Sequence, residues 1–323
     1  MRTTTSLILA SLLAGCTATI TPASATPVTL MLDWVPNTNH SGVFVAQQEG
    51  YFADEGLQVD IVQPGEVYAE LAVAGGGADF GVSFQEQVTL ARADGVPLVS
   101  IAAILQHNTS AFAARAGSGG GTPAGWEGLR YGSFGSPFER PTVEGLMECA
   151  GGDVGRVVWI ETGFTDPLSL LQQGQIDLAW IFYGWQGVQA EQLGVDLDLV
   201  MMEDHFDCIP DYYTPVLIAS EATLAERPAL AGSFLRALAR GYAFAAERPD
   251  EAAEILLTAA PELDREVVLA SQRWISPRYQ AEAARWGEQS ADRWQTYADW
   301  MTSQGILAET LDAAQAFSNE YLP

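Results

Sequence analysis

Short apolar segments alternate with short helix-forming segments along most of the chain, and this alternation restricts the possible fold more than any other feature. In a first series, the apolar pattern predicts strands at 30–32, 58–62, 79–82 and 98–105, with helices between them. A second series of the same kind runs from 129 to 201. Strands joined by helices pair in parallel through right-handed crossovers, and 323 residues are enough for two lobes. The sequence therefore predicts an α/β protein with two lobes.

The last third of the chain departs from this alternation. A strand predicted at 213–219 is followed by long amphipathic helices, in which apolar residues recur at helical spacing through 224–257. Tryptophans 274, 286, 294 and 300 lie in these helices and are predicted to be core residues.

The charge balance excludes several classes of partner and one class of enzyme. The chain carries 41 acidic and 15 basic residues, which gives a net charge of -26, and all of the basic residues are arginines. Such a surface repels the phosphates of nucleic acids and of anionic lipids. Because pyridoxal phosphate forms its internal aldimine with a lysine amine, a chain without lysine cannot be an enzyme of that kind.

The N-terminal segment is typical of an exported lipoprotein. Arg2 precedes an apolar segment that is too short to span a membrane, and the sequence LAGC at 13–16 resembles a bacterial lipobox. We predict a signal peptide at 1–15, a lipidated Cys16 and a flexible tether at 16–27. The alternative is cleavage after Ala25, because Ala23-Ser24-Ala25 also fits a signal-peptidase site.

Two further cysteines, Cys149 and Cys208, remain in the predicted mature chain. An even number of cysteines in an exported protein permits a disulfide bond, although their distance in space does not follow from the sequence. Bridged and free cysteines therefore both remain open.

A strand, a polar and aromatic loop, and a helix follow one another in residues 30–52. The loop after the predicted strand contains Asp33, Trp34, Asn37 and His40, and a helix at 43–49 ends at Gly50. Ligands of open α/β sheets bind beyond the carboxyl ends of the strands. We therefore expect this loop to form part of a ligand site.

Five segments of the chain are similar to one known family. They are LMLDWVPNTNHSGVFVAQQEGYF (30–52), DFGVSFQEQVTLARADGVPLVSIAAILQH (79–107), YGSFGSPFERP (131–141), ETGFTDPLSLLQQGQIDLAWIFYGWQGVQAE (161–191) and PDYYTPVLIASE (210–221). In this order they resemble the pyrimidine-precursor family. That family includes the formylaminopyrimidine-binding lipoproteins of thiamine-salvage ABC importers and the fungal enzyme that makes the thiamine pyrimidine.

The resemblance implies a two-lobe, type II periplasmic-binding-protein-like fold, in which two parallel or mixed sheets are joined by a two-strand hinge. Lobe one would comprise 28–114 together with 216–323, and lobe two would comprise 115–215. The chain would leave lobe one at 112–117 and return at 212–216. The ligand would then bind in a cleft between the lobes.

A flat heteroaromatic ring requires aromatic faces for stacking and a few polar groups for its edge. The aromatic candidates at predicted strand ends and loops are Trp34, Tyr68, Phe134, Tyr183, Trp185 and Tyr212, and the polar ones are Asn37, His40, Ser83, Gln85, Gln106, Glu139 and Gln186. Glu139 is expected to accept a hydrogen bond from a ring amino group. Asn37 and His40 could instead only form the turn. Asp166 could cap the helix that begins at Pro167.

Catalysis is a weaker hypothesis than binding. Aligned without gaps to the fungal enzyme, the chain has Ser83 where the family's Schiff-base lysine stands and Gln87 where its catalytic histidine stands. The three histidines, His40, His107 and His205, lack the spacing of a helical metal site. We expect no enzyme activity, cofactor or metal, and a pyrimidine precursor synthase is the alternative from another class.

The sequence thus predicts a bacterial, extracytoplasmic, lipid-anchored and monomeric binding protein of an ABC importer. Its ligand would be a thiamine pyrimidine precursor, and its partner the importer's permease subunits. Relatives tend to carry a carboxylate where this chain has Gln186, whose amide also suits a ring with a carbonyl beside an N–H group. Riboflavin, or another small organic solute, is therefore the alternative ligand. Nitrate- or sulfonate-like anions are disfavoured because the candidates include no arginine cluster.

Overall fold

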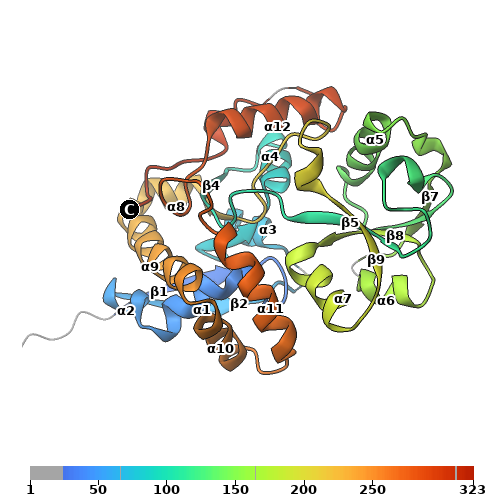
Figure 1. Ribbon diagram of the computed structural model, residues 1–323. Helices are drawn as coiled ribbons and strands as arrows, with labels where there is room; N and C mark the ends of the chain where they lie inside the picture. The colour runs from blue at the N-terminus through green and yellow to red at the C-terminus, as the bar shows by residue number, and fades with distance from the viewer. Residues whose placement is uncertain (1–24, 66, 164, 310) are drawn as a thin grey trace, which may run out of the picture.

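The computed structural model describes residues 25–65, 67–163, 165–309 and 311–323. It contains two lobes, each built around a five-stranded sheet (Figure 1). The predicted signal peptide (1–15), the predicted lipidation site Cys16 and the tether up to residue 24 lie outside the described residues. None of the described helices is both long enough and apolar enough to cross a membrane.

The first lobe contains a mixed sheet with the strand order β2-β1-β3-β10-β4. Its strands are β1 (Thr26–Met31), β2 (Leu57–Val62), β3 (Phe80–Ser83), β4 (Leu98–Ala103) and β10 (Val216–Ser220). β1 pairs in parallel with β2 and β3, whereas β10 runs antiparallel to β3 and β4. The returning strand therefore completes the first sheet, as the resemblance implied.

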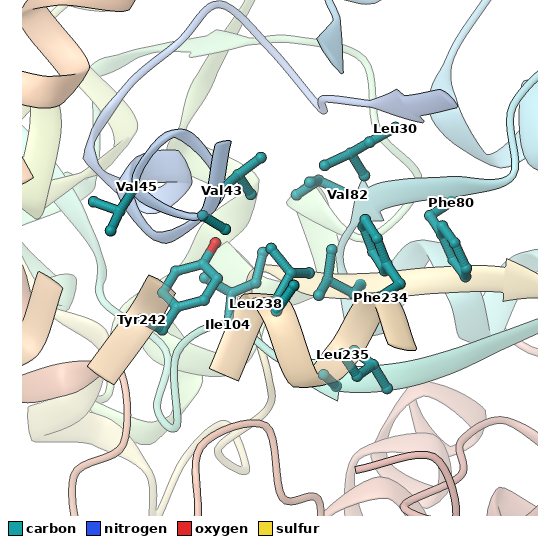
Figure 2. Packing of buried hydrophobic residues seen from close by; sticks show 14 of the residues in the cluster. Leu30, Val43, Val45, Phe80, Val82, Ile104, Phe234, Leu235, Leu238 and Tyr242 are labelled. Carbon is teal, nitrogen blue, oxygen red and sulfur yellow. The ribbon is translucent and has the colours of Figure 1, made fainter. Parts of the chain in front are cut away.

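The helices of the first lobe come from both ends of the chain. They are α1 (Ser41–Gln48), α2 (Tyr51–Asp54), α3 (Ala69–Ala74), α4 (Gln85–Ala93), α8 (Glu221–Glu226), α9 (Pro228–Glu247), α10 (Pro249–Ala259) and α11 (Arg265–Ile275). Figure 2 shows Phe234 of α9 beside Phe80 of β3, and their rings stack with centroids 4.1 Å apart. α1 and α9 pack closely because both have glycine at the contact: a Cβ on Gly241 would lie 2.0 Å from the carbonyl oxygen of Gly42.

The second lobe contains a mixed sheet with the order β7-β6-β8-β5-β9. Its elements are β5 (Ser110–Arg115), β6 (Arg130–Ser133), α5 (Glu139–Cys149), β7 (Val158–Glu161), α6 (Pro167–Gln172), β8 (Leu178–Phe182), the π-helical turn η4 (Tyr183–Gly187), α7 (Val188–Gln192) and β9 (Leu197–Met201). Phe112 of β5 lies at the centre of an aromatic core, with ring centroids 4.8 Å from Trp126 and 5.2 Å from Trp180. Single 3₁₀ turns are η1 (Thr38–His40), η2 (Pro123–Trp126), η3 (Val154–Arg156), η5 (Met202–His205), η6 (Ser276–Arg278) and η7 (Ala313–Gln315).

The chain leaves the first lobe earlier than predicted. β5 (Ser110–Arg115) is antiparallel to β8 and β9 and so belongs to the second sheet. The outward crossing therefore lies between β4 and β5, not at 112–117, and the predicted boundary after residue 114 is wrong. The prediction failed because two apolar strands of different sheets are separated here only by the short polar stretch 106–109.

The helix α12 (Ala291–Ser303), which was assigned to lobe one with the rest of 216–323, contacts both lobes. Trp294 packs in a buried cluster with Tyr213 and Val216 of the first lobe, whereas Tyr297 and Met301 belong to the core of the second. In Figure 1, α12 runs above the junction between the two lobes. The lobes are thus connected by two crossing segments and by this helix.

The disulfide bond that the sequence permitted is formed. Cys149 and Cys208 are bonded, with their Cα atoms 5.9 Å apart. The bond joins the end of α5 to the segment that returns to the first lobe.

Candidate functional site

The carboxyl-terminal edges of the two sheets meet between the lobes. Phe84 directly follows β3 in the first lobe, and Phe182 is the last residue of β8 in the second. Their rings stack with centroids 6.1 Å apart and planes inclined by 13°. β1 is parallel to β3, and β6 is parallel to β8, so the loops after β1 and β6 lie at this same edge. Open α/β sheets bind their ligands at this edge.

The loop after β1 is held by its own polar side chains. Oδ1 of Asn37 accepts a hydrogen bond from the backbone N–H of Asn39 at 2.9 Å, and Nδ1 of His40 accepts one from the N–H of Asn37 at 3.2 Å. Nε2 of His40 therefore carries the proton and donates it to Asp33 at 2.6 Å. Both ring nitrogens of His40 are used within the loop, so neither is free to act as a general base.

These contacts correct the predicted roles of Asn37 and His40. Both side chains are buried and form the turn, which was the other interpretation of their positions. Their effect is to fix Trp34, whose ring is 39% exposed at the start of this loop.

Two carboxyl groups lie at the same edge: Asp33 of the predicted loop, and Glu70, which was not predicted. The buried hydroxyl of Ser83, at the end of β3, donates a hydrogen bond to Glu70 in the first turn of α3. Burial raises the pKa of Glu70; the hydrogen bond from Ser83 partly offsets this, and the charge of Asp33 raises the pKa further. Asp33 and Glu70 therefore act on one another electrostatically. Glu70 lies in a short helix, where an acidic residue is usually solvent-exposed, so its place in the site could not be predicted from the sequence.

The turn η4 brings the second lobe against α11. The ring of Tyr183 lies 4.9 Å from that of Trp274, and a Cβ on Gly184 would lie 2.8 Å from the same indole. Trp185 packs against the core of the first lobe. Tyr183 and Trp185 thus both lie at the junction of the lobes. Because Gly184 has no side chain, the indole of Trp274 can approach the backbone of η4 closely.

Ser271 of α11 links η4 to the loop after β1. Its buried hydroxyl donates to the carbonyl oxygen of Gly184, and its oxygen lies 2.6 Å from Oγ1 of Thr38. Residues 38 and 184, far apart in sequence, therefore meet through one side chain. A serine in an amphipathic helix does not indicate from the sequence that it joins two distant loops.

Glu139 is not available to a ligand. Its carboxylate accepts hydrogen bonds from the hydroxyls of Tyr131 and Ser133 at 2.8 and 2.9 Å. It also accepts from the backbone N–H groups of residues 134, 135 and 136 at 3.1, 2.7 and 2.8 Å. Two carboxylate oxygens offer about four lone-pair positions. The acceptor capacity of Glu139 is used by its own loop in this arrangement, and its contact with a ring amino group stays a prediction.

Four other candidates make contacts within the protein. Oε1 of Gln85 accepts from the N–H of Tyr213 at 2.8 Å, and Nε2 of Gln106 donates to the carbonyl of Glu288 at 3.1 Å. Oε1 of Gln186 accepts from the N–H of Phe182 at 3.0 Å. The ring of Tyr212 is buried and stacks on Tyr297 of α12, with centroids 4.2 Å apart. All four side chains are buried, and Nε2 of Gln85 has no hydrogen-bond partner among the described residues. Asp166 caps α6 through the N–H of Ser169.

The remaining aromatic candidates have accessible rings. Tyr68, which precedes α3, is 49% exposed, and Phe134 after β6 is partly exposed with its ring 6.1 Å from that of Trp180. Two hollows lie away from the meeting point of the sheets. One of about 300 Å³ is lined by residues 160–162, 165, 170, 175 and 176, and one of about 410 Å³ by residues 247–251 and 273.

Comparison with known proteins places these features in a family. A family model described as "NMT1/THI5 like" matches residues 37–252. The formylaminopyrimidine-binding protein of Halalkalibacterium halodurans is 32% identical over 323 residues, covering 97% of each chain. The 4-amino-5-hydroxymethyl-2-methylpyrimidine phosphate synthase of Legionella pneumophila is 27% identical, covering 92% of each chain. The riboflavin-binding protein RibY of Chloroflexus aurantiacus is 26% identical, covering 92% of this chain and 86% of that one.

Solved structures share the fold. The alkanesulfonate-binding protein SsuA of Xanthomonas axonopodis pv. citri, bound to MOPS, superposes with a TM-score of 0.71 at 16% identity, covering 92% of this chain and 99% of that one. The predicted two-lobe α/β fold is thereby confirmed.

Proposed function

Because this chain belongs to the NMT1/THI5 like family, we propose that it is a solute-binding protein that captures a thiamine pyrimidine precursor between its lobes for an ABC importer. The main support is the meeting of two sheet edges, one with Trp34, Asp33 and Glu70 and the other with Phe134 and Tyr183. The 32% identity to a protein named for binding formylaminopyrimidine supports this class of ligand.

An aminopyrimidine needs the groups that these edges carry. Its flat ring can stack on Trp34 or Tyr68, which are exposed on the first lobe. Its amino N–H groups are donors, and the carboxylates of Asp33 and Glu70 are acceptors at the same edge. Each carboxylate already accepts one hydrogen bond from the protein, which fixes its orientation and leaves further lone pairs.

Closure of the lobes would hold the ligand. A ligand that contacts both edges favours the closed arrangement by the difference between its affinities for the closed and open forms. Ser271 and the Phe84–Phe182 pair already join the two lobes in the arrangement described above. We infer that these contacts form last as the solute is enclosed.

We further propose that the protein works outside the cytoplasm on a lipid anchor at Cys16. The support is the lipobox-like sequence at 13–16, which lies outside the described residues. An intact-mass spectrum of the membrane-bound protein should show an acylated chain that begins at Cys16. An unacylated soluble chain that begins at Thr26 would refute the anchor.

The ligand is tested by a thermal-shift panel of thiamine, hydroxymethylpyrimidine, formylaminopyrimidine, riboflavin and taurine. A ligand present at 100 times its dissociation constant raises the free energy of unfolding by about 2.7 kcal/mol. We expect formylaminopyrimidine or hydroxymethylpyrimidine to give the largest shift. A large shift with riboflavin alone would show that the solute is a flavin and not a pyrimidine. A shift with taurine alone would favour a sulfonate.

A further inference from the structure

A loop of the second lobe forms an anion-binding concavity that the chain itself fills. Three successive backbone N–H groups, those of residues 134, 135 and 136, point to the carboxylate of Glu139 at 2.7 to 3.1 Å. The hydroxyls of Tyr131 and Ser133 complete the set at 2.8 and 2.9 Å. We call these five donors the nest. Successive N–H groups arranged in this way are a general receptor for anions.

The nest is fully occupied by a fixed negative charge. Glu139 is 1% exposed, and its two oxygens accept five hydrogen bonds, which exhausts its lone pairs. Burial, and then the charge of Glu139, raise the pKa of Tyr131 well above its ordinary value. The phenol therefore keeps its proton and donates a hydrogen bond to the carboxylate. An external anion would have to displace Glu139 and leave a buried carboxylate without partners, which is strongly unfavourable.

The nest lies at the sheet edge where the solute is proposed to bind. It follows β6, whose parallel neighbour β8 ends at Phe182, the residue that stacks on Phe84 of the first lobe. Phe134 supplies the first N–H of the nest, and its ring lies 6.1 Å from that of Trp180 in β8. The opposite edge carries Asp33 and Glu70, which also repel anions.

We propose that Glu139 is a specificity residue: as an internal anion it occupies the nest and so excludes phosphorylated, sulfonated and other anionic solutes, leaving neutral or cationic rings. The proposal rests on the proposed function for the location of the solute. In this proposal Glu139 excludes anionic ligands and does not itself contact the solute that binds.

Removal of the carboxylate should convert the nest into an anion site. In the Glu139→Ala variant, five donors lose their acceptor and a hollow remains where a tetrahedral anion can enter. The matched control is Glu148→Ala, which removes the same charge from an exposed position of the same helix. Isothermal titration with inorganic phosphate and with sulfate should show affinity at least about tenfold higher for Glu139→Ala than for wild type, and no gain for the control.

A folded Glu139→Ala protein that binds neither anion better than wild type would overturn the proposal, as would equal gains in both variants. This comparison needs no pyrimidine, so its outcome is independent of the proposed ligand. If Glu139→Ala does not fold, as judged by circular dichroism, wild type is compared with the conservative variant Glu139→Gln. Binding of inorganic phosphate or sulfate to wild type that the Glu139→Gln substitution alters would contradict an occupied nest. Absence of measurable anion binding to wild type supports it.

Discussion

At the scale of single residues, Glu86 shows how burial couples stability to pH. Its side chain is buried in the first turn of α4, and one carboxyl oxygen has no hydrogen-bond partner among the described residues. Burial is the main cause that raises its pKa to about 8. The folded protein therefore keeps this proton at pH values where the unfolded chain, with an ordinary glutamate, has lost it. This contribution to stability is complete below the unfolded pKa of 4.5 and is lost as pH rises toward 8.

The Glu86→Gln variant should remove this dependence while keeping the shape of the side chain. Between the two pKa values, one such group lowers the free energy of unfolding by at most about 1.4 kcal/mol per pH unit. Urea unfolding of both proteins at several pH values from 5 to 8 measures the effect. We expect the stability of wild type to fall relative to that of the variant over this range. Parallel curves for the two proteins would show that Glu86 does not hold its proton.

Trp34 and Tyr183 test the aromatic faces of the proposed site. Replacement of either by alanine should weaken solute binding by about 1–3 kcal/mol, the usual cost of truncating an aromatic contact. Trp34→Ala should leave stability almost unchanged because the ring is 39% exposed, whereas Tyr183→Ala also loses the contact with Trp274. Titration calorimetry gives the affinities, and Leu193→Ala, at a 60% exposed position in the second lobe, serves as control. Unchanged affinity in both aromatic variants would place the solute elsewhere.

Which polar residues serve the loop and which serve the solute could not be predicted from the sequence. Asn37, His40 and Glu139 were sound candidates because each follows a strand, yet their side chains turn back to backbone groups of their own segments. The direction in which a side chain points decides whether it serves the loop or the solute. That direction depends on contacts with residues a few positions away in the sequence. Glu70 was not predicted because its proximity to Asp33 arises only when α3 lies beside the loop after β1.

At the scale of elements, the disulfide bond fixes α5 to the returning segment. Cys149 and Cys208 are 59 residues apart in sequence. In the chain-entropy account, a cross-link that closes a loop of this length raises the free energy of unfolding by about 4 kcal/mol. A Cys149→Ser, Cys208→Ser double variant should therefore unfold at a lower denaturant concentration in oxidising buffer. A midpoint equal to that of wild type would show that the bond does not constrain the unfolded chain.

Most elements of the sheets could be predicted because apolar strands and their flanking turns are local features. The strands expected at 58–62 and 79–82 lie within one residue of the observed bounds of β2 and β3. β5 was assigned to the wrong lobe, and the contact of α12 with the second lobe was not predicted, because each element is apolar in a way that fits either lobe. Trp294 and Tyr297 lie three residues apart on one helix and face different cores. Local periodicity detects that such a helix is buried, but it does not reveal which lobe buries it.

At the scale of the whole molecule, the two lobes are joined by more than the predicted hinge. Besides the two crossing segments, α12 packs on both cores, and Ser271 of α11 binds the second lobe through Gly184. Opening must therefore release the contact at η4 while α12 either bends with the hinge or moves with one lobe. The net charge of -26 keeps such a molecule soluble and away from phosphate-rich surfaces, consistent with capture of a small solute.

A crystal structure of the protein with bound formylaminopyrimidine would show where the solute binds. We predict that the ring lies between the lobes, against Trp34 and Asp33 or Glu70 on one side and against Phe134 or Tyr183 on the other. We also predict that Glu139 still occupies the nest. A ring bound in the hollow beside β7 and α6, or at any position that touches one lobe only, would contradict the proposed function.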